Sequence, residues 1–384
     1  MILSSLKLAN VRGYESLSLA LGPRLTVLAG DNAQGKTNLL RAVEALGLGD
    51  DGAAPGDLLR HGAEGGHLEG RLEQDGGPIR LAAALTGRGV RLALNGKTVP
   101  RGRWMGRLPV LFVGPEDRDQ VTGPPAARRA LLDELLEQAE PAYLAALREY
   151  RRALRQRNRA LSRPDATDGE VAIWEEPMAR AAGALLSRRV RAVEALAPRA
   201  AAWHGELTGA MAGRDLTLRY EATVAAPADA SEAAWSEAVA AALEANRGRD
   251  RAVGTTLGGP HRDEVAIVLA GRPLKAHGSS GEIWSAILAL ALGCAEHLGA
   301  RLGRLPLLLL DDVLTALDRA RRERLLAVLE GLPQALLTTT HAPDPGAART
   351  LFAVRAHTVS PLGAEEAAIA WTSDTPRPAQ FARC

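Results

Sequence analysis

Residues 30–37, Gly-Asp-Asn-Ala-Gln-Gly-Lys-Thr, follow the phosphate-binding pattern G-x-x-x-x-G-K-[ST]. The whole chain has only four lysines, so a lysine at position 36 is seldom placed there by chance. An apolar run at 25–29 precedes the loop, and residues 38–46 carry apolar side chains at helical spacing. A strand, a glycine-rich loop and a helix N-terminus present backbone N–H groups to phosphate. We therefore expect a nucleotide-binding loop, with a plain glycine-rich turn as the alternative.

Two side chains of this loop are expected to have defined roles in binding a nucleotide. Lys36 would reach the β- and γ-phosphates, and Thr37 would offer its hydroxyl to Mg²⁺. The predicted contacts to the cofactor are Gly30, Asp31, Asn32, Ala33, Gln34, Gly35, Lys36, Thr37 and Asn38.

Composition narrows the class of protein. A length of 384 residues suggests two or three domains, or one large domain with an insertion. A net charge of +2 means that any basic surface is local, and two cysteines argue against a disulfide framework. The first residues lack a basic region followed by an apolar block, and the longest apolar stretch, 283–295, is too short to span a bilayer. We expect a cytoplasmic protein with no membrane partner.

The chain alternates between strand-rich and helix-rich segments. Residues 1–113 contain several strand candidates, including a hairpin around Asn95-Gly96. Helical periodicity dominates from about 124 to 250, and strands alternate with helices after that. We predict an α/β fold with a discontinuous ATPase lobe, an inserted, mainly helical lobe and a loose tail. The boundaries are 1–123 and 251–372, 124–250, and 373–384.

Two carboxylates follow a buried-strand candidate at 307–310. A strand ending in Asp delivers a carboxylate to the sheet edge where Mg²⁺ lies beside a phosphate loop. We assign Asp311 to Mg²⁺ and Asp312 to orienting the attacking water. Taken without the phosphate loop, the same pair is also typical of helix capping.

Four further residues are candidates for the nucleotide site. Ser279 and Gly281 precede a helix whose free N–H groups suit an anion, although Ser279 and Glu282 also form a capping-box pattern. Asp318, which follows the segment 314–317, is a further predicted contact to the cofactor. His341, after three threonines at a strand end, is placed to contact a γ-phosphate or is an ordinary surface residue.

The order of these motifs resembles the ABC-type ATPase heads of the SMC and RecF families. Residues 10–14, Asn-Val-Arg-Gly-Tyr, resemble a family segment whose arginine, here Arg12, lies by the nucleotide. The resemblance runs from about residue 2 to 345 and implies a P-loop core with mixed sheets plus a mainly helical second lobe. The segments that resemble RecF in particular are 57–62, 114–117, 128–136, 150–158, 259–263 and 309–313.

The resemblance also implies an activity and partners. Ser279 and Gly281 would reach across a homodimer to the partner's ATP, and a slow, DNA-stimulated ATPase would be coupled to dimer dissociation. The implied role is to mediate recombination at gapped duplex DNA, helping RecA to load with RecR and RecO. Two departures concern Ser280 and Glu282, where the family commonly has Gln, and Asp312, where ABC ATPases commonly have Glu.

Arginines gather in the segment 148–163, whose only acid is Glu149. Neutralising a duplex backbone requires such a patch, and it predicts steep salt dependence with little sequence preference. A solvated helix face is the other interpretation. The predicted DNA contacts are Arg148, Arg151, Arg152, Arg155 and Arg159.

Two rival functions remain open. An ABC ATPase that powers a transporter would leave the helical insertion and residues 259–263 unexplained. A DNA clamp in which ATP is only structural would differ from a slow ATPase because it would not hydrolyse ATP.

Overall fold

The computed structural model of the chain describes residues 1–49, 55–209, 216–340 and 349–362. Packing divides the chain into two compact units. Of the described residues, those in Met1–Pro115, in Leu307–Thr315 and from Arg322 onward form unit 1, and those in Glu116–Pro306 and Ala316–Arg321 form unit 2. The predicted domains differ from these units mainly at 251–306, which pack with the helical unit.

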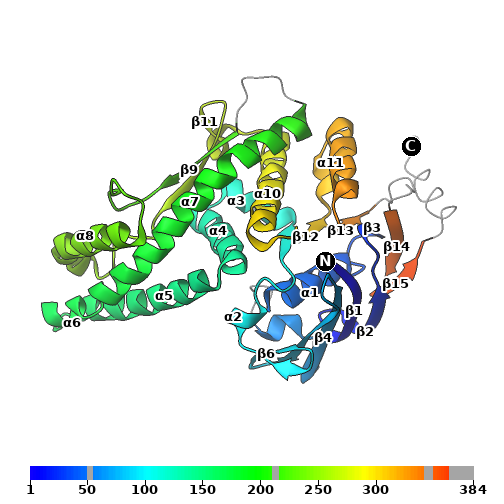
Figure 1. Cartoon of the computed structure of the whole chain (residues 1–384), viewed down its shortest axis with the longest axis horizontal. Coiled ribbons are helices and arrows are strands. Elements are labelled where there is room, and N and C mark those ends of the chain that lie inside the picture. The colour runs from blue at the N-terminus through cyan, green and yellow to red at the C-terminus, as the bar shows by residue number, and fades with distance from the viewer. Residues whose placement is uncertain (50–54, 210–215, 341–348, 363–384) are drawn as a thin grey trace, which may run out of the picture. The chain divides into compact units, whose positions relative to one another are not determined.

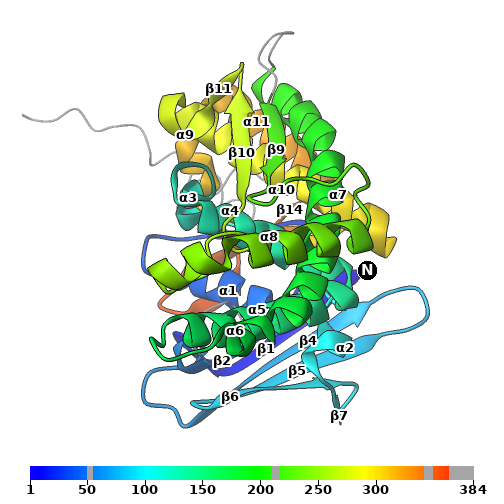
Figure 2. The same cartoon turned by 90° about the vertical axis from the view of Figure 1, so that its left-hand side faces the viewer.

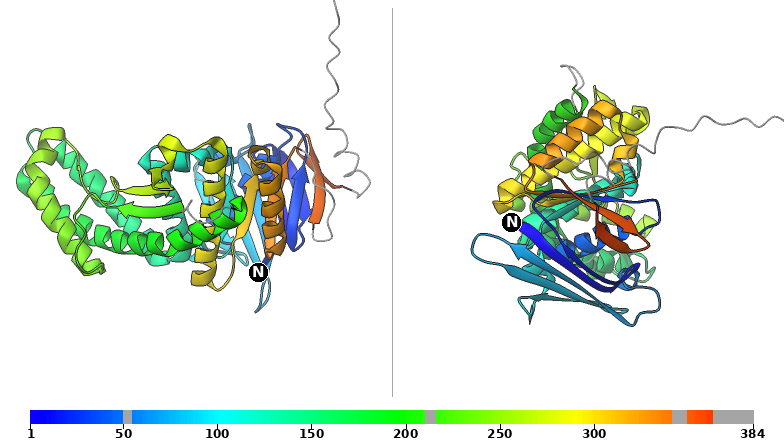
Figure 3. Two further views of the ribbon diagram at one scale, coloured as in Figure 1. Left: turned by 90° about the horizontal axis from the view of Figure 1, so that it is seen from above. Right: turned by 90° about the vertical axis from the view of Figure 1, so that its right-hand side faces the viewer.

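Unit 1 contains two six-stranded sheets (Figure 1). The first is antiparallel in the order β2-β1-β4-β5-β6-β7, and its blue to cyan strands form one layer in the right-hand view of Figure 3. Its strands are β1 (Ile2–Val11), β2 (Tyr14–Ala20), β4 (Gly65–Glu73), β5 (Ile79–Thr86), β6 (Gly89–Leu94) and β7 (Lys97–Thr98). The predicted Asn95-Gly96 hairpin is confirmed, because Leu94 pairs with Lys97 and both turn residues have positive φ.

The second sheet of unit 1 runs in the order β15-β14-β3-β13-β12-β8. All neighbours except β14 and β15 are parallel. Its strands are β3 (Arg24–Ala29), β8 (Val110–Val113), β12 (Leu307–Asp311), β13 (Gln334–Thr339), β14 (Arg349–Arg355) and β15 (Thr358–Pro361). Asp311 pairs with Thr338, and Thr339 pairs with Ala29, so three strands end at one edge of the sheet.

Helix α1 (Lys36–Leu48) contacts strands of both sheets, which explains why ten of its thirteen residues are buried. Two glycines permit this close packing. A Cβ on Gly47 would lie 2.6 Å from Val110 of the second sheet. A Cβ on Gly70 of the first sheet would lie 2.4 Å from Leu46. The buried helix therefore fixes the phosphate loop at its N-terminus between the two layers.

The other elements of unit 1 are short, apart from α11, whose first three residues group with unit 2. They are α2 (Arg101–Trp104), α11 (Arg319–Gly331) and the 3₁₀ turns η1 (Pro55–Leu58), η2 (Pro115–Asp117) and η3 (Val313–Ala316), of which η2 and η3 also extend into unit 2.

Unit 2 is mainly helical, and α7 contacts α5, α8 and α10 (Figure 2). A three-stranded antiparallel sheet, β11-β10-β9, packs with these helices. The helices are α3 (Arg118–Thr122), α4 (Pro125–Ala139), α5 (Pro141–Leu161), α6 (Asp168–Ala172), α7 (Glu175–Thr208), α8 (Glu232–Val253), α9 (Leu274–His277) and α10 (Ser280–Leu302). The strands are β9 (Leu216–Glu221), β10 (Glu264–Leu269) and β11 (Arg272–Pro273). Because β10 pairs with β9 and α10 packs on α7, residues 251–306 belong to this unit.

Helix α10 corrects the expectation that no apolar segment is long enough to cross a bilayer. It has 23 residues and, by length and composition alone, would span one. Its most apolar 18-residue window is 78% buried inside the structure, as in the core helix of a globular unit.

Candidate functional site

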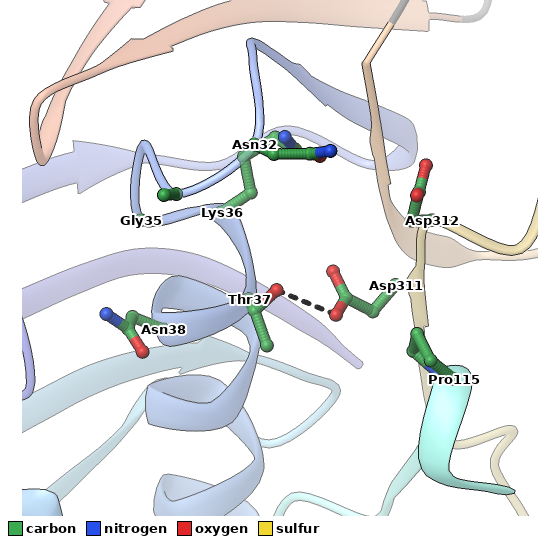
Figure 4. A pocket seen from close by; sticks show the side chains of 9 residues that line it. Asn32, Gly35, Lys36, Thr37, Asn38, Pro115, Asp311 and Asp312 are labelled. Atoms are coloured by element: carbon green, nitrogen blue, oxygen red, sulfur yellow. Dashed lines mark hydrogen bonds between the residues drawn. The ribbon is translucent and has the colours of Figure 1, made fainter.

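The phosphate loop, residues 30–35, joins the end of β3 to the start of α1. Gly35 occupies the N-cap position with φ 106°, and no side chain caps the helix there. The first N–H groups of α1 are therefore left for a ligand. A pocket of about 300 Å³ opens at this point (Figure 4). Its lining residues are Asn32, Ala33, Gly35, Lys36, Thr37, Asn38, Pro115, Asp311 and Asp312.

Lys36 is buried, with 6% of its surface exposed, and its ammonium group donates to carbonyl oxygens of its own loop. The distances from Nζ are 2.5 Å to Gly30 and 2.7 Å to Asp31. Burial lowers the pKa of Lys36, while Asp312, Asp311 and Asp31 oppose that shift. A buried cation that donates to loop carbonyls is well suited to exchange them for an anionic phosphate.

Asp311 ends β12 and is 4% exposed. Its two carboxylate oxygens accept hydroxyl hydrogen bonds from two elements, Thr37 at 2.7 Å and Thr338 at 2.6 Å. Figure 4 shows the Thr37–Asp311 bond facing the pocket. A hydroxyl and a carboxylate are hard oxygen donors, and a site completed by nucleotide phosphates is the kind that Mg²⁺ uses. The donor set therefore fits the predicted Mg²⁺ ligands.

Asp312 adopts a left-handed backbone conformation, with φ 51°. Its N–H donates to the Thr338 hydroxyl (2.9 Å), and its carbonyl accepts from Thr315 (2.8 Å). A non-glycine residue in this region costs energy and is held there by its surroundings. The result is a second carboxylate in the pocket lining, beside the one that bonds Thr37.

The segment 10–14 reaches the same loop through Tyr14, whose hydroxyl donates to the Gly35 carbonyl at 3.1 Å. Arg12 lies in the turn between β1 and β2, with φ 48° and its N–H bonded to the Leu58 carbonyl. Gln34 is directed to the β14–β15 hairpin, because its side-chain oxygen accepts from the Ala356 N–H at 2.7 Å. Gln34 was predicted to contact the cofactor, but its side chain already bonds a residue outside the loop.

Ser279 and Gly281 belong to unit 2, at the start of α10. The capping box is confirmed, since Ser279 and Glu282 bond reciprocally. Asp318, also in unit 2, caps α11 by accepting from the Arg321 N–H at 2.9 Å. Their contact with nucleotide stays a prediction. His341 lies outside the described residues.

The five predicted DNA contacts are exposed residues of α5 at helical spacing. Arg151 pairs with Asp133 at 3.2 Å. For Arg148, Arg152, Arg155 and Arg159, no side-chain ion pair or hydrogen bond is recorded within the described part of the chain.

Sequence reasoning missed two contributors to the pocket's surroundings. Thr338 holds Asp311 in place, and its only signal was a polar residue at the end of a buried strand. His357, in the turn of an unpredicted hairpin, contacts the loop through its N–H to the Gln34 carbonyl (2.9 Å).

Known proteins resemble the chain along nearly its whole length, although no protein-family model matches it. It is 40% identical over 377 residues to the DNA replication and repair protein RecF of Anaeromyxobacter dehalogenans strain 2CP-1, covering 94% of this chain and 100% of that protein. It is 39% identical over 351 residues to RecF of Acidothermus cellulolyticus, covering 88% of this chain and 94% of the relative.

Solved structures show the same fold. A structure described as the recombination mediator protein RecF-ATP in the RecFOR pathway has a TM-score of 0.85 at 24% identity, covering 94% of this chain and 97% of that one. An SMC head from Pyrococcus furiosus has a TM-score of 0.51 at 15% identity, covering 97% and 98%. These matches confirm the predicted class, an ABC-type ATPase head with mixed sheets and a mainly helical second lobe. With relatives of this identity and coverage, the chain belongs to the RecF family of DNA replication and repair proteins.

Proposed function

We propose that this chain is a slow ATPase that dimerises with ATP on duplex DNA and mediates recombination at gaps. The observation that carries the proposal is the pocket in which Lys36, Thr37, Asp311 and Asp312 meet. Phosphoryl transfer needs little covalent chemistry from the protein, so positioning and charge do most of the work. These four side chains supply the groups that such a reaction uses.

In the proposed reaction, Lys36 leaves the carbonyls of Gly30 and Asp31 to bind phosphate oxygens. Thr37 and Asp311 would hold Mg²⁺, which neutralises phosphate charge when it is bound. Asp312 would orient the attacking water, and His341 would contact the γ-phosphate. Asp312 is one methylene shorter than the common Glu, which supports a slow reaction that serves as a switch.

ATP hydrolysis is proposed to cause the dimer to dissociate. Each ATP would be sandwiched by Ser279 and Gly281 of the partner copy, with Asp318 and Arg12 as additional contacts. Because nucleotide would bind the dimer better than the monomer, ATP would favour association, and hydrolysis would reverse it.

The proposed DNA surface is the arginine face of α5. Arg148, Arg152, Arg155 and Arg159 are exposed and form no ion pair with any described residue, so they can neutralise phosphates without reading bases. Aromatic side chains are scarce, 3% of the chain, so stacking with single strands is disfavoured. Duplex DNA beside a gap, DNA-stimulated turnover, RecA loading with RecR and RecO, and a cytoplasmic location complete the proposal.

The two rival functions predict different results. A clamp with structural ATP would bind DNA but show no turnover above an Asp312→Asn variant. A transporter subunit would bind ATP without binding duplex DNA at low salt.

The first test measures ATP turnover with and without duplex DNA. Wild type should hydrolyse slowly and faster with DNA, and Asp312→Asn should abolish turnover while leaving ATP binding. Lys36→Arg, which keeps a cation but loses turnover, should retain ATP-dependent dimerisation. Equal turnover in wild type and Asp312→Asn would exclude the ATPase.

The second test measures duplex binding as a function of salt. Arg152→Gln with Arg155→Gln should weaken binding and reduce the slope of log K against log salt by about one to two. The matched control is Arg163→Gln with Arg180→Gln, because these arginines already pair with Glu170 and Glu176. No duplex binding at low salt, with or without ATP, would overturn the DNA assignment.

A further inference from the structure

The turn of the β14–β15 hairpin, residues 356–357, contacts the phosphate loop from outside the pocket. The N–H of Ala356 donates to the Gln34 side-chain oxygen at 2.7 Å. The N–H of His357 donates to the Gln34 carbonyl at 2.9 Å. Neither turn residue lines the nucleotide pocket, so the hairpin acts on the loop without replacing a ligand contact.

These bonds satisfy the loop's acceptors. A loop that directs N–H groups at phosphate points its carbonyl groups away, and those carbonyls need donors. The Gln34 carbonyl obtains one from the hairpin, and the Gly35 carbonyl, which already accepts from the Leu39 N–H at 3.0 Å, accepts a second bond from Tyr14 at 3.1 Å. Burial raises the pKa of Tyr14 well above its ordinary value, so its hydroxyl keeps its proton. The loop is therefore tied to the hairpin on one side and to Tyr14 on the other.

The imidazole ring of His357 is packed between the two segments that meet at the loop. It lies edge-on to the Tyr14 ring, with centroids 5.3 Å apart and planes at 90°. A Cβ on Gly13 would lie 2.0 Å from the His357 Nε2, and one on Gly35 would lie 2.6 Å from its Cδ2. Two glycines thus leave the space that this ring fills.

The turn is strained, which argues that its contacts matter. Ala356 and His357 both have positive φ, 46° and 61°. A two-residue hairpin turn of this kind is usually built from Asn and Gly. Non-glycine residues persist in this region only where the surroundings hold them there.

We propose that His357, together with Tyr14, is a positioning residue that holds the phosphate loop in its nucleotide-binding conformation before ATP arrives. The inference rests on the proposed binding of ATP in unit 1. A loop that is already ordered loses less conformational entropy when ATP binds. The apparent affinity for ATP therefore depends on the fraction of molecules whose loop is already in the binding conformation. Loosening the hairpin should weaken ATP binding while leaving the fold intact.

The test uses His357→Gly, which removes the ring and suits a left-handed φ. The full chain is titrated with ATP and Mg²⁺ by calorimetry, and its melting temperature is measured without nucleotide. If the fraction of molecules with the loop in its binding conformation falls to about a tenth, the Kd for ATP should rise about tenfold. The melting temperature should stay unchanged or increase. The matched control is Ala270→Gly, the same relief of a left-handed residue (φ 51°) in unit 2.

A double-mutant cycle isolates the packing of the ring. Gly13→Ala should displace the ring and weaken ATP binding, whereas Gly13→Ala in the His357→Gly background should cost little more, because the clash is gone. ATP binding by His357→Gly within about twofold of wild type, or an equal loss in Ala270→Gly, would overturn the inference alone. A wild-type chain that binds no ATP would overturn the proposed function as well.

Discussion

The arginines of helix α5 differ in burial: Arg157 is buried in ion pairs, whereas its neighbours are exposed. Arg157 of α5 is fully buried, where it donates to Asp250 at 2.7 Å and to Glu175 at 3.0 Å. Arg155 and Arg159, two residues to either side, are exposed on the opposite face. A buried guanidinium needs such partners, and removing one leaves the other charge uncompensated. The sequence showed an arginine-rich helix, but its partners, almost twenty to a hundred residues away, were visible only in the structure.

We predict that His261 makes the stability of unit 2 depend on pH. Its Nε2 lies 3.1 Å from the Thr256 carbonyl and therefore carries the proton, and its Nδ1 accepts from the Tyr150 hydroxyl at 2.6 Å. Burial lowers the pKa of His261 from 6.5 to about 4. Between these values the unfolded chain binds more protons than the folded one, so stability falls as the pH falls.

We expect unit 2 to lose about 2 kcal/mol of unfolding free energy between pH 7.5 and 5 through this histidine. Urea unfolding at the two pH values measures the change. His261→Asn, which cannot gain a proton, should be less stable at pH 7.5 but should lose about 2 kcal/mol less on acidification. An equal loss of unfolding free energy on acidification in both proteins would show that His261 is not its source.

Helix α7 continues past a residue that normally ends a helix. Proline lacks an N–H and normally ends or kinks a helix, so Pro198 would be expected to interrupt this one. The helix continues through Pro198 to Thr208. Ala200 just beyond it is fully buried, and a Cβ on Gly293 of α10 would lie 3.2 Å from the Ala200 nitrogen. Close packing of α10 on α7 thus outweighs the lost hydrogen bond.

Replacing this proline should stabilise the protein. Pro198 is exposed, so Pro198→Ala removes little packing and restores one helical hydrogen bond. We expect a gain of roughly 1–3 kcal/mol in the free energy of unfolding, measured with urea. Pro177→Ala is the control, because Pro177 lies in the first turn of the same helix, where the N–H has no helical partner. A gain at 177 equal to that at 198 would refute this explanation.

The elements predicted best were those with strong periodicity or turn chemistry. The strand before the phosphate loop, α1 and the strand ending in Asp311 were located from sequence to within two residues. Strands β14 and β15 were missed, because their turn, Ala356-His357, lacks the Asn or Gly that marks such hairpins. The missed hairpin is the element that contacts Gln34, so the support of the nucleotide site was also missed.

The predicted nucleotide contacts are divided between the two units. Lys36, Thr37, Asp311 and Asp312 form one pocket in unit 1, whereas Ser279, Gly281 and Asp318 belong to unit 2. The sequence could place these motifs in order along the chain, but the domain boundary at 250 put all of them in one lobe. The structure assigns the two groups to separately packed bodies.

The proposed trans contact of Ser279 can be tested by adding charge where a partner's phosphates would lie. Aspartate is a good N-cap, so Ser279→Asp keeps the cap of α10 but repels a phosphate. We expect it to abolish dimerisation with ATP and Mg²⁺, measured by sedimentation in an Asp312→Asn background that prevents turnover. Ser231→Asp, the same exchange at the cap of α8, should dimerise normally.

The nearby Glu282 carboxylate would repel the aspartate of Ser279→Asp and weaken the helix cap. The variant Ser279→Ala therefore separates loss of the cap from repulsion of the phosphate. It loses the cap, at a cost of about 1 kcal/mol in stability, without adding charge. If the trans contact is real, the alanine variant should dimerise more weakly than wild type and much better than the aspartate variant. Normal dimerisation of Ser279→Asp, or a wild-type chain that stays monomeric with ATP and Mg²⁺, would rule out a nucleotide site completed by a second copy.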